Sequence, residues 1–166
     1  DIIPHGDQYW ADPFLISVGG ETYVFFEDYE YRTKLGAIAE RSRTIGPRDI
    51  ELFTEISGDR NPLHYDEEAA RATKFGQIVV QGGITSAILN AVVAEDLPGP
   101  GTVFLQVNWS FKAPGRPGDT ITGRVEVTEV RSDKPITKLK TTVTRGDGVV
   151  LLEGDAVCFT FAMPKR

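Results

Sequence analysis

The stretch from Gly82 to Glu95 restricts the possible folds of this chain more than any other feature of its sequence. Apolar residues occupy nearly every side of the helix that this stretch would form: Ile84, Ala87, Ile88, Leu89, Ala91, Val92 and Val93. A surface helix keeps a polar face, so a helix that is apolar all round is expected to be buried. The sequence therefore predicts a buried helix, ended by the glycines and prolines of residues 98–101.

The pattern after this helix changes to the alternation that is typical of β-strands. Val103, Leu105, Val107, Trp109 and Phe111 alternate with more polar residues, which predicts that this face is buried. The alternation returns at 121–127, slips near Val130 as at a β-bulge, and returns again at 139–143. Gly146-Asp147-Gly148 predicts a hairpin turn before a last strand at 149–161. The expected fold class is α+β.

Two short helices are predicted before the buried one. Pro47 suits the first position of a helix, Ile50, Phe53 and Ile56 give it one apolar stripe, and Gly58 ends it. Asp66 is a good N-cap for a second helix over 67–73, since it is followed by two glutamates. Weak alternation over 35–44 predicts a strand ahead of both.

Composition excludes several classes of protein. The chain has 166 residues, 40% hydrophobic and 25% charged, which suits one globular domain. Its net charge of −6 argues against nucleic acid as a partner. We find neither an apolar run of about eighteen residues nor a leader, and so expect no membrane span and no signal peptide. The single cysteine, Cys158, lies in an apolar run, which predicts a buried inert thiol and a reducing, cytoplasmic location.

The loop between the two short helices concentrates the chemistry. Asp59 and His64 are five positions apart, in a loop that Gly58 opens and Pro62 stiffens. A carboxylate and an imidazole held together can grip one water and move a proton near neutral pH. The alternative from spacing alone is that Asp59 caps a turn and His64 packs against the next helix.

The loop sequence Gly-Asp-Arg-Asn-Pro-Leu-His-Tyr-Asp at 58–66, followed by Phe-Gly-Gln-Ile-Val-Val-Gln-Gly-Gly at 75–83, resembles the signature of MaoC-like (R)-specific 2-enoyl-CoA hydratases. The resemblance implies a hot-dog fold, in which a curved antiparallel sheet wraps a long central helix, and a homodimer. It also implies an acyl-CoA thioester as substrate and hydration of trans-2-enoyl-CoA to (R)-3-hydroxyacyl-CoA. No metal and no cofactor are expected beyond the coenzyme A of the substrate.

The resemblance and the chemistry of the reaction together give each candidate residue a role. Asp59 and His64 would hold the water and relay the proton. Gly82 begins the buried helix, so its amide could stabilise the negative charge on the thioester oxygen, although Gly82 and Gly83 could simply start the helix tightly. Asn90 stands where the family often has serine and is a candidate substrate-binding residue, while Asn61 is expected to orient the loop. Gln81 replaces the histidine that usually precedes this glycine.

Two other functions stay open from the sequence. The first is a hot-dog acyl-CoA thioesterase, and the second is a non-catalytic acyl-CoA-binding domain. Coenzyme A is a polyanion, so each of the three functions, hydratase included, would need a local basic patch. Candidates are Lys112 with Arg116, or a second group formed by Arg131, Lys134, Lys138 and Lys140.

The N-terminal residues 1–23 are expected to be an extension of separate origin. His5 to Leu15 resembles a blade segment of five-bladed propeller carbohydrate-active proteins, but one blade cannot bury its faces alone, so no glycosidase chemistry is expected from Asp12. Gly19-Gly20 predicts a hairpin turn between strands at 15–18 and 22–26.

The hot-dog domain is placed at 24–162, since residues 25–30 resemble the usual opening of MaoC-like domains. Residues 163–166 are expected to form a tail.

Overall fold

The computed structural model describes residues 8–18, 21–30 and 34–163, and the first two of these ranges through their backbone alone. The elements in chain order are β1 (Gln8–Val18), β2 (Glu21–Glu30), β3 (Ile38–Thr44), α1 (Pro47–Ser57), the 3-10 turn η2 (Pro62–His64), α2 (Glu67–Arg71), α3 (Gly82–Glu95), β4 (Thr102–Phe111), β5 (Thr120–Val130), β6 (Ile136–Arg145) and β7 (Val150–Thr160).

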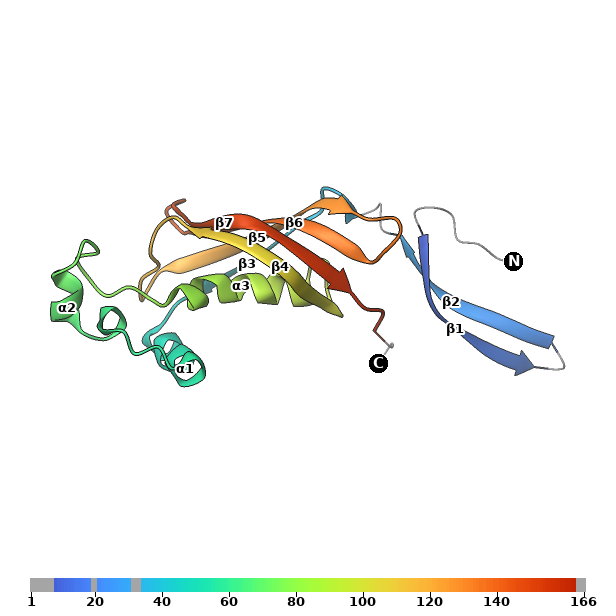
Figure 1. Cartoon of the computed structure of the whole chain (residues 1–166), viewed down its shortest axis with the longest axis horizontal. Helices are drawn as coiled ribbons and strands as arrows, with labels where there is room; N and C mark the ends of the chain where they lie inside the picture. Colours follow the sequence, from blue (N-terminus) through green and yellow to red (C-terminus); the bar gives the residue numbers. More distant parts are fainter. Residues whose placement is uncertain (1–7, 19–20, 31–33, 164–166) are drawn as a thin grey trace.

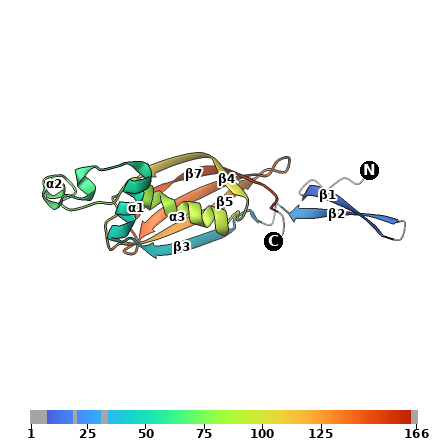
Figure 2. The ribbon, with the colours of Figure 1, turned by 90° about the horizontal axis from the view of Figure 1, so that it is seen from below.

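Five of the strands form one antiparallel sheet, in the order β3-β5-β6-β7-β4. Helix α3 lies along one face of this sheet, and α1 and α2 gather at the end where α3 begins (Figure 1). The view from below shows α3 crossing beneath the strands (Figure 2). The sheet and this helix therefore form two layers, with the predicted catalytic loop at one end of them.

The helix boundaries follow from local signals that the sequence contains. Pro47 begins α1, and Gly58, with φ 76°, ends it in the left-handed region. The Asp66 carboxylate accepts from the amides of Glu68 and Ala69 and so caps α2. These boundaries and those of α3 confirm the predictions, although α2 ends two residues earlier than predicted.

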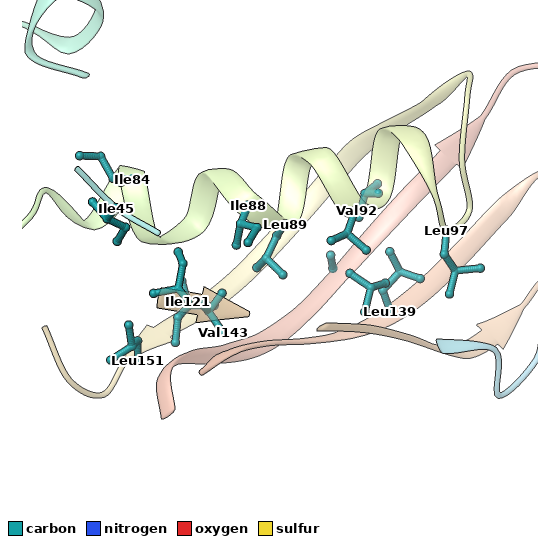
Figure 3. Packing of buried hydrophobic residues seen from close by; sticks show 14 of the residues in the cluster. Ile45, Ile84, Ile88, Leu89, Val92, Leu97, Ile121, Leu139, Val143 and Leu151 are labelled. Carbon is teal, nitrogen blue, oxygen red and sulfur yellow. The ribbon is translucent and has the colours of Figure 1, made fainter. Parts of the chain in front are cut away.

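The core lies between α3 and the sheet (Figure 3). Leu89 and Val92 of α3 are fully buried against Ile121, Leu139 and Val143, which are also fully buried. The predicted inward faces of β5 and β6 are confirmed, as is a bulge in β5, where the register shifts between Val127 and Glu129. The Cys158 thiol is buried in β7, and burial raises its pKa to about 12, as expected for an inert side chain.

Helix α3 is not buried all round, so that interpretation of its sequence was wrong. Ile84, Ile88 and Leu89 face the sheet and are buried, whereas Ala87 and Asn90 are exposed. The reason is that the five-stranded sheet covers only one side of the helix. The apolar residues on the other side remain open in the single chain.

The predicted buried face of β4 is also wrong. Of its five apolar residues only Trp109 is half-buried, while Leu105 and Phe111 are 57% and 56% exposed. A register shift against β7 between Phe104 and Gln106 reverses the alternation, so Phe104 joins Trp109 against the core. In addition β4 is an edge strand, with one neighbour only.

The structure begins the sheet later than the sequence suggested. Gly36 has φ 76° and belongs to a turn, so β3 starts at Ile38 and not at Leu35. Strands β1 and β2 pair as the predicted hairpin, with Val18 opposite Glu21, and form a separate two-stranded sheet. Residues 25–30 thus pair with β1. Gly19-Gly20 and residues 164–166 lie outside the described residues.

Candidate active site

Hydrogen bonds within the loop occupy every polar atom of Asp59 except one. Its amide donates to Ser57 Oγ at 3.1 Å, and its carbonyl accepts from Thr54 Oγ1 at 2.8 Å. Its Oδ1 accepts from the amide of Asn61 at 3.0 Å. The carboxylate is therefore fixed by the backbone that follows α1, and only Oδ2 is left to act on another group.

A single hydrogen bond orients the ring of His64. Its Nδ1 lies 2.7 Å from the carbonyl oxygen of Val79. A carbonyl can only accept, so Nδ1 carries a proton, and Nε2 is the nitrogen that has a lone pair when the ring is neutral. The side chain is 9% exposed and lies in η2, where the Pro62 turn directs it towards the start of α3.

These two groups meet as predicted. His64 Nε2 lies 3.5 Å from Asp59 Oδ2, which is too long for a strong direct hydrogen bond. When the ring is neutral, both atoms are acceptors, and a molecule that donates two hydrogen bonds can bridge them. Water is the simplest such molecule, and its oxygen lone pairs would stay free.

A cavity of about 370 Å³ joins His64 to the start of α3, whereas Asp59 is not among its lining residues. His64, Val79, Gly82 and Phe111 are among its lining residues, and most of its other walls are apolar. The amide of Ile84 bonds to the Gln81 carbonyl, so the amides of Gly82 and Gly83 are the ones that the first turn leaves without an intrahelical acceptor. A Cβ at position 82 would lie 3.1 Å from the Phe111 ring, so glycine keeps this approach open.

Of the five predicted residues, His64 and Gly82 line this cavity, and Asp59, Asn61 and Asn90 do not. Asn61 caps η2 by accepting from the amide of Leu63 at 3.2 Å, which agrees with the expected orienting role. Asn90 lies eight residues along α3 from Gly82, or about 12 Å, and is exposed away from the lining residues. Its role in substrate binding stays a prediction.

The two basic groups differ in their surroundings. Lys112 lines the cavity together with Lys74, and Arg116 lines a neighbouring hollow of about 480 Å³ with Arg71. In the second group, Arg131 pairs with Asp133 and Lys138 pairs with Glu129. Lys112 pairs with Glu153 as well, so what separates the two groups is that Lys112 lines the cavity and no member of the second group does.

Two contributors to the site were missed from the sequence. Val79 acts through its backbone carbonyl, for which no sequence signal exists. Thr54 and Gln81 form a buried polar contact at 3.0 Å behind the loop. The sequence indicated Thr54 only through its position four residues after Ile50, which places both residues on the same buried face of α1.

Among the residues that the structure describes, no three His, Cys, Asp or Glu side chains gather as metal ligands would. None of the helices in the described ranges has the length and hydropathy that a membrane crossing requires.

The helix laid along a five-stranded antiparallel sheet defines a hot-dog fold, with a loop carboxylate and imidazole beside the helix start. The solved (R)-hydratase from A. caviae, involved in PHA biosynthesis, shares this fold: its TM-score is 0.73 at 35% identity, over 76% of this chain and 96% of that one. The model of the MaoC like domain family matches residues 32–148, and the chain belongs to this family.

Two curated relatives cover most of the chain. The (R)-specific enoyl-CoA hydratase of Rhodospirillum rubrum is 37% identical over 142 residues, which span 86% of this chain and 93% of the relative. The 3-hydroxybutyryl-CoA dehydratase of Methylorubrum extorquens is 37% identical over 134 residues, 81% of this chain and 82% of the relative.

Proposed function

We propose that this protein is a hydro-lyase that reversibly hydrates trans-2-enoyl-CoA to (R)-3-hydroxyacyl-CoA. The relatives named as (R)-specific enoyl-CoA hydratase and 3-hydroxybutyryl-CoA dehydratase support the reaction and its substrate class. The observation that carries the proposal is the 3.5 Å separation of Asp59 Oδ2 from His64 Nε2, together with a cavity that His64 and Gly82 both line.

The geometry suits the chemistry of hydration. Asp59 and His64 hold a water whose oxygen forms a bond to C3, while one of its O–H bonds breaks. The proton returns to C2 through the same pair, and the π bond between C2 and C3 is lost. In the transition state negative charge develops on the thioester oxygen, which the Gly82 amide would stabilise. A donor of this kind contributes about 3 to 4 kcal/mol.

The lining of the cavity suits an acyl thioester. Leu63, Phe75, Val80 and Phe111 give it an apolar wall for the acyl chain. Lys74 and Lys112 line the same cavity and would meet the phosphates of coenzyme A. Lys112 also pairs with Glu153 at 3.0 Å, but both side chains are about half exposed, so solvent weakens this pair.

We also propose a homodimer that forms through the free edge of β4. This strand has no charged residue between Thr102 and Phe111, and Val103, Leu105 and Val107 are exposed on it. The opposite edge, β3, carries Glu40, Arg41 and Arg43, and charges protect an edge from pairing. A reducing, cytoplasmic location is supported by the single, buried cysteine.

Chiral analysis of the products from a panel of trans-2-enoyl-CoA thioesters tests the function. We expect loss of the enoyl absorbance, an (R)-3-hydroxyacyl product and no release of free thiol. Thiol release without hydration would assign a thioesterase instead. Binding of coenzyme A thioesters by calorimetry with no turnover of any of them would assign a non-catalytic binding domain.

A further inference from the structure

The proposed reaction uses the Asp59 carboxylate, the His64 ring and the Gly82 amide. The hydroxyl of Thr54 contacts the chain at or directly beside each of these three residues. Thr54 lies in α1 and is 5% exposed. Its Oγ1 donates to the carbonyl of Asp59 at 2.8 Å and contacts the Tyr65 hydroxyl, which directly follows His64. It also accepts from Gln81 Nε2 at 3.0 Å, one residue before Gly82.

The direction of each of these bonds follows from the atoms involved. A threonine hydroxyl has one proton and two lone pairs. The Asp59 carbonyl can only accept, so it takes the proton. The two lone pairs can then accept from Gln81 Nε2 and from the Tyr65 hydroxyl, which also lies 3.4 Å from the Ile50 carbonyl oxygen.

The side chain of Gln81 gives independent support for this arrangement. It is 1% exposed, and its Oε1 is buried without a hydrogen-bond partner among the described residues. If the amide were reversed, Oε1 would face the Thr54 oxygen, whose proton is already committed to Asp59. Thr54, together with the Ile50 carbonyl that accepts from the same nitrogen at 3.5 Å, therefore selects the orientation of Gln81.

We propose that Thr54 is a positioning residue, which sets the carboxylate of Asp59, the imidazole of His64 and the amide of Gly82 relative to one another. It touches no reacting atom and acts through the three groups that it bonds. This role rests on the proposed hydration. Errors of about 1 Å in such a site can cost as much as 10²-fold in rate.

The test compares Thr54→Val with wild type and Thr54→Ser on a short trans-2-enoyl-CoA. Valine keeps the shape and removes the hydroxyl, and we expect kcat to fall about 10- to 100-fold with KM within about twofold. Serine keeps the hydroxyl and is expected to restore kcat to within about threefold of wild type. A Thr54→Val enzyme with wild-type kcat, or a serine variant as slow as the valine variant, would overturn the proposal.

Thr141→Val is the matched control. Thr141 is fully buried in β6, and its hydroxyl also accepts from a side chain, Trp109 Nε1, and donates to a carbonyl, that of Gly154, both at 3.0 Å. This variant should lower the melting temperature but leave kcat within about twofold of wild type, because Thr141 lies outside the site. A fall in kcat as large as that of Thr54→Val would show a general effect of lost stability and overturn the proposal.

Gln81→Met gives a second measurement should Thr54→Val fail to fold. This variant removes the hydrogen bond from Gln81 to Thr54 and leaves the Thr54 hydroxyl in place. We therefore expect kcat to fall by about three- to tenfold with little change in KM. An unchanged kcat would count against the proposal. Turnover by the wild-type chain tests the proposed function separately, so failure of one is distinguished from failure of the other.

Discussion

Individual residues of the loop have separate tasks, although they are close in sequence. Asp59 and Asp66 are both loop aspartates that accept from backbone amides. Asp66 uses its Oδ1 to cap α2, whereas Asp59 keeps Oδ2 free opposite His64. The same residue type is thus structural at one position and available for chemistry at the other.

Asp59→Asn and His64→Ala should each lower the turnover of crotonyl-CoA by about 10²-fold or more, the usual scale for an acid-base group. Asparagine at 59 can still accept from the Asn61 amide, but it places a donor where Oδ2 accepts. Steady-state kinetics and circular dichroism would measure activity and fold. Asp66→Asn is the control, because asparagine caps a helix as well as aspartate, and it should stay near wild type. Near-wild-type hydration by either site variant would remove the proposed mechanism.

The helices position the site because α1 packs closely on the start of α3. A Cβ at Gly83 would lie 2.1 Å from Cζ of Phe53 in α1. Glycine at this position therefore allows the contact that holds the end of α1, and with it Asp59, near Gly82. The sequence suggested only that two glycines begin a helix.

Gly83→Ala should reduce both stability and activity. Alanine favours a helix over glycine by about 1 kcal/mol, but overpacking against Phe53 costs about 1 to 3 kcal/mol, and the displaced α1 moves the loop. Urea denaturation and kcat measurements would show this. Gly146→Ala is the control, since its Cβ would meet only the Thr120 carbonyl oxygen at 3.6 Å. A Gly83→Ala protein with wild-type stability and activity would contradict the importance of this contact.

At the scale of the whole molecule, the fold leaves apolar surface uncovered at one edge and on one side of α3. Leu105 of β4 is 57% exposed beside unpaired backbone groups, and Ala87 of α3 is exposed. A second copy paired along β4 would form hydrogen bonds with the unpaired backbone groups of this edge strand, and symmetric dimers commonly cover such edges.

Leu105→Lys is expected to convert a dimer into a monomer, because a lysine on this edge adds charge where the two strands would pair. Light scattering would measure the mass, which we expect to be twice that of one chain for wild type. Ile38→Lys makes the same change on the edge of β3, where Ile38 is 49% exposed, and should leave the dimer intact. A monomeric wild type, or a dimeric Leu105→Lys, would contradict pairing through β4.

The sequence by itself determined the features that depend on neighbouring residues. Pro47, Gly58 and Asp66 set the ends of short helices through their own backbone preferences and caps, and the short loop between these helices keeps Asp59 near His64. These signals act over a few residues, so they need no knowledge of the rest of the fold.

Only the tertiary structure decided the features that depend on distant partners. The contact of Phe104 with the core results from a bulge against β7, and the open side of α3 from the single sheet that covers it. The ring of His64 is oriented by a carbonyl fifteen residues away, and Gln81 reaches Thr54 across twenty-seven. Burial, register and hydrogen-bond direction arise when separate segments meet, and local sequence patterns do not encode where that happens.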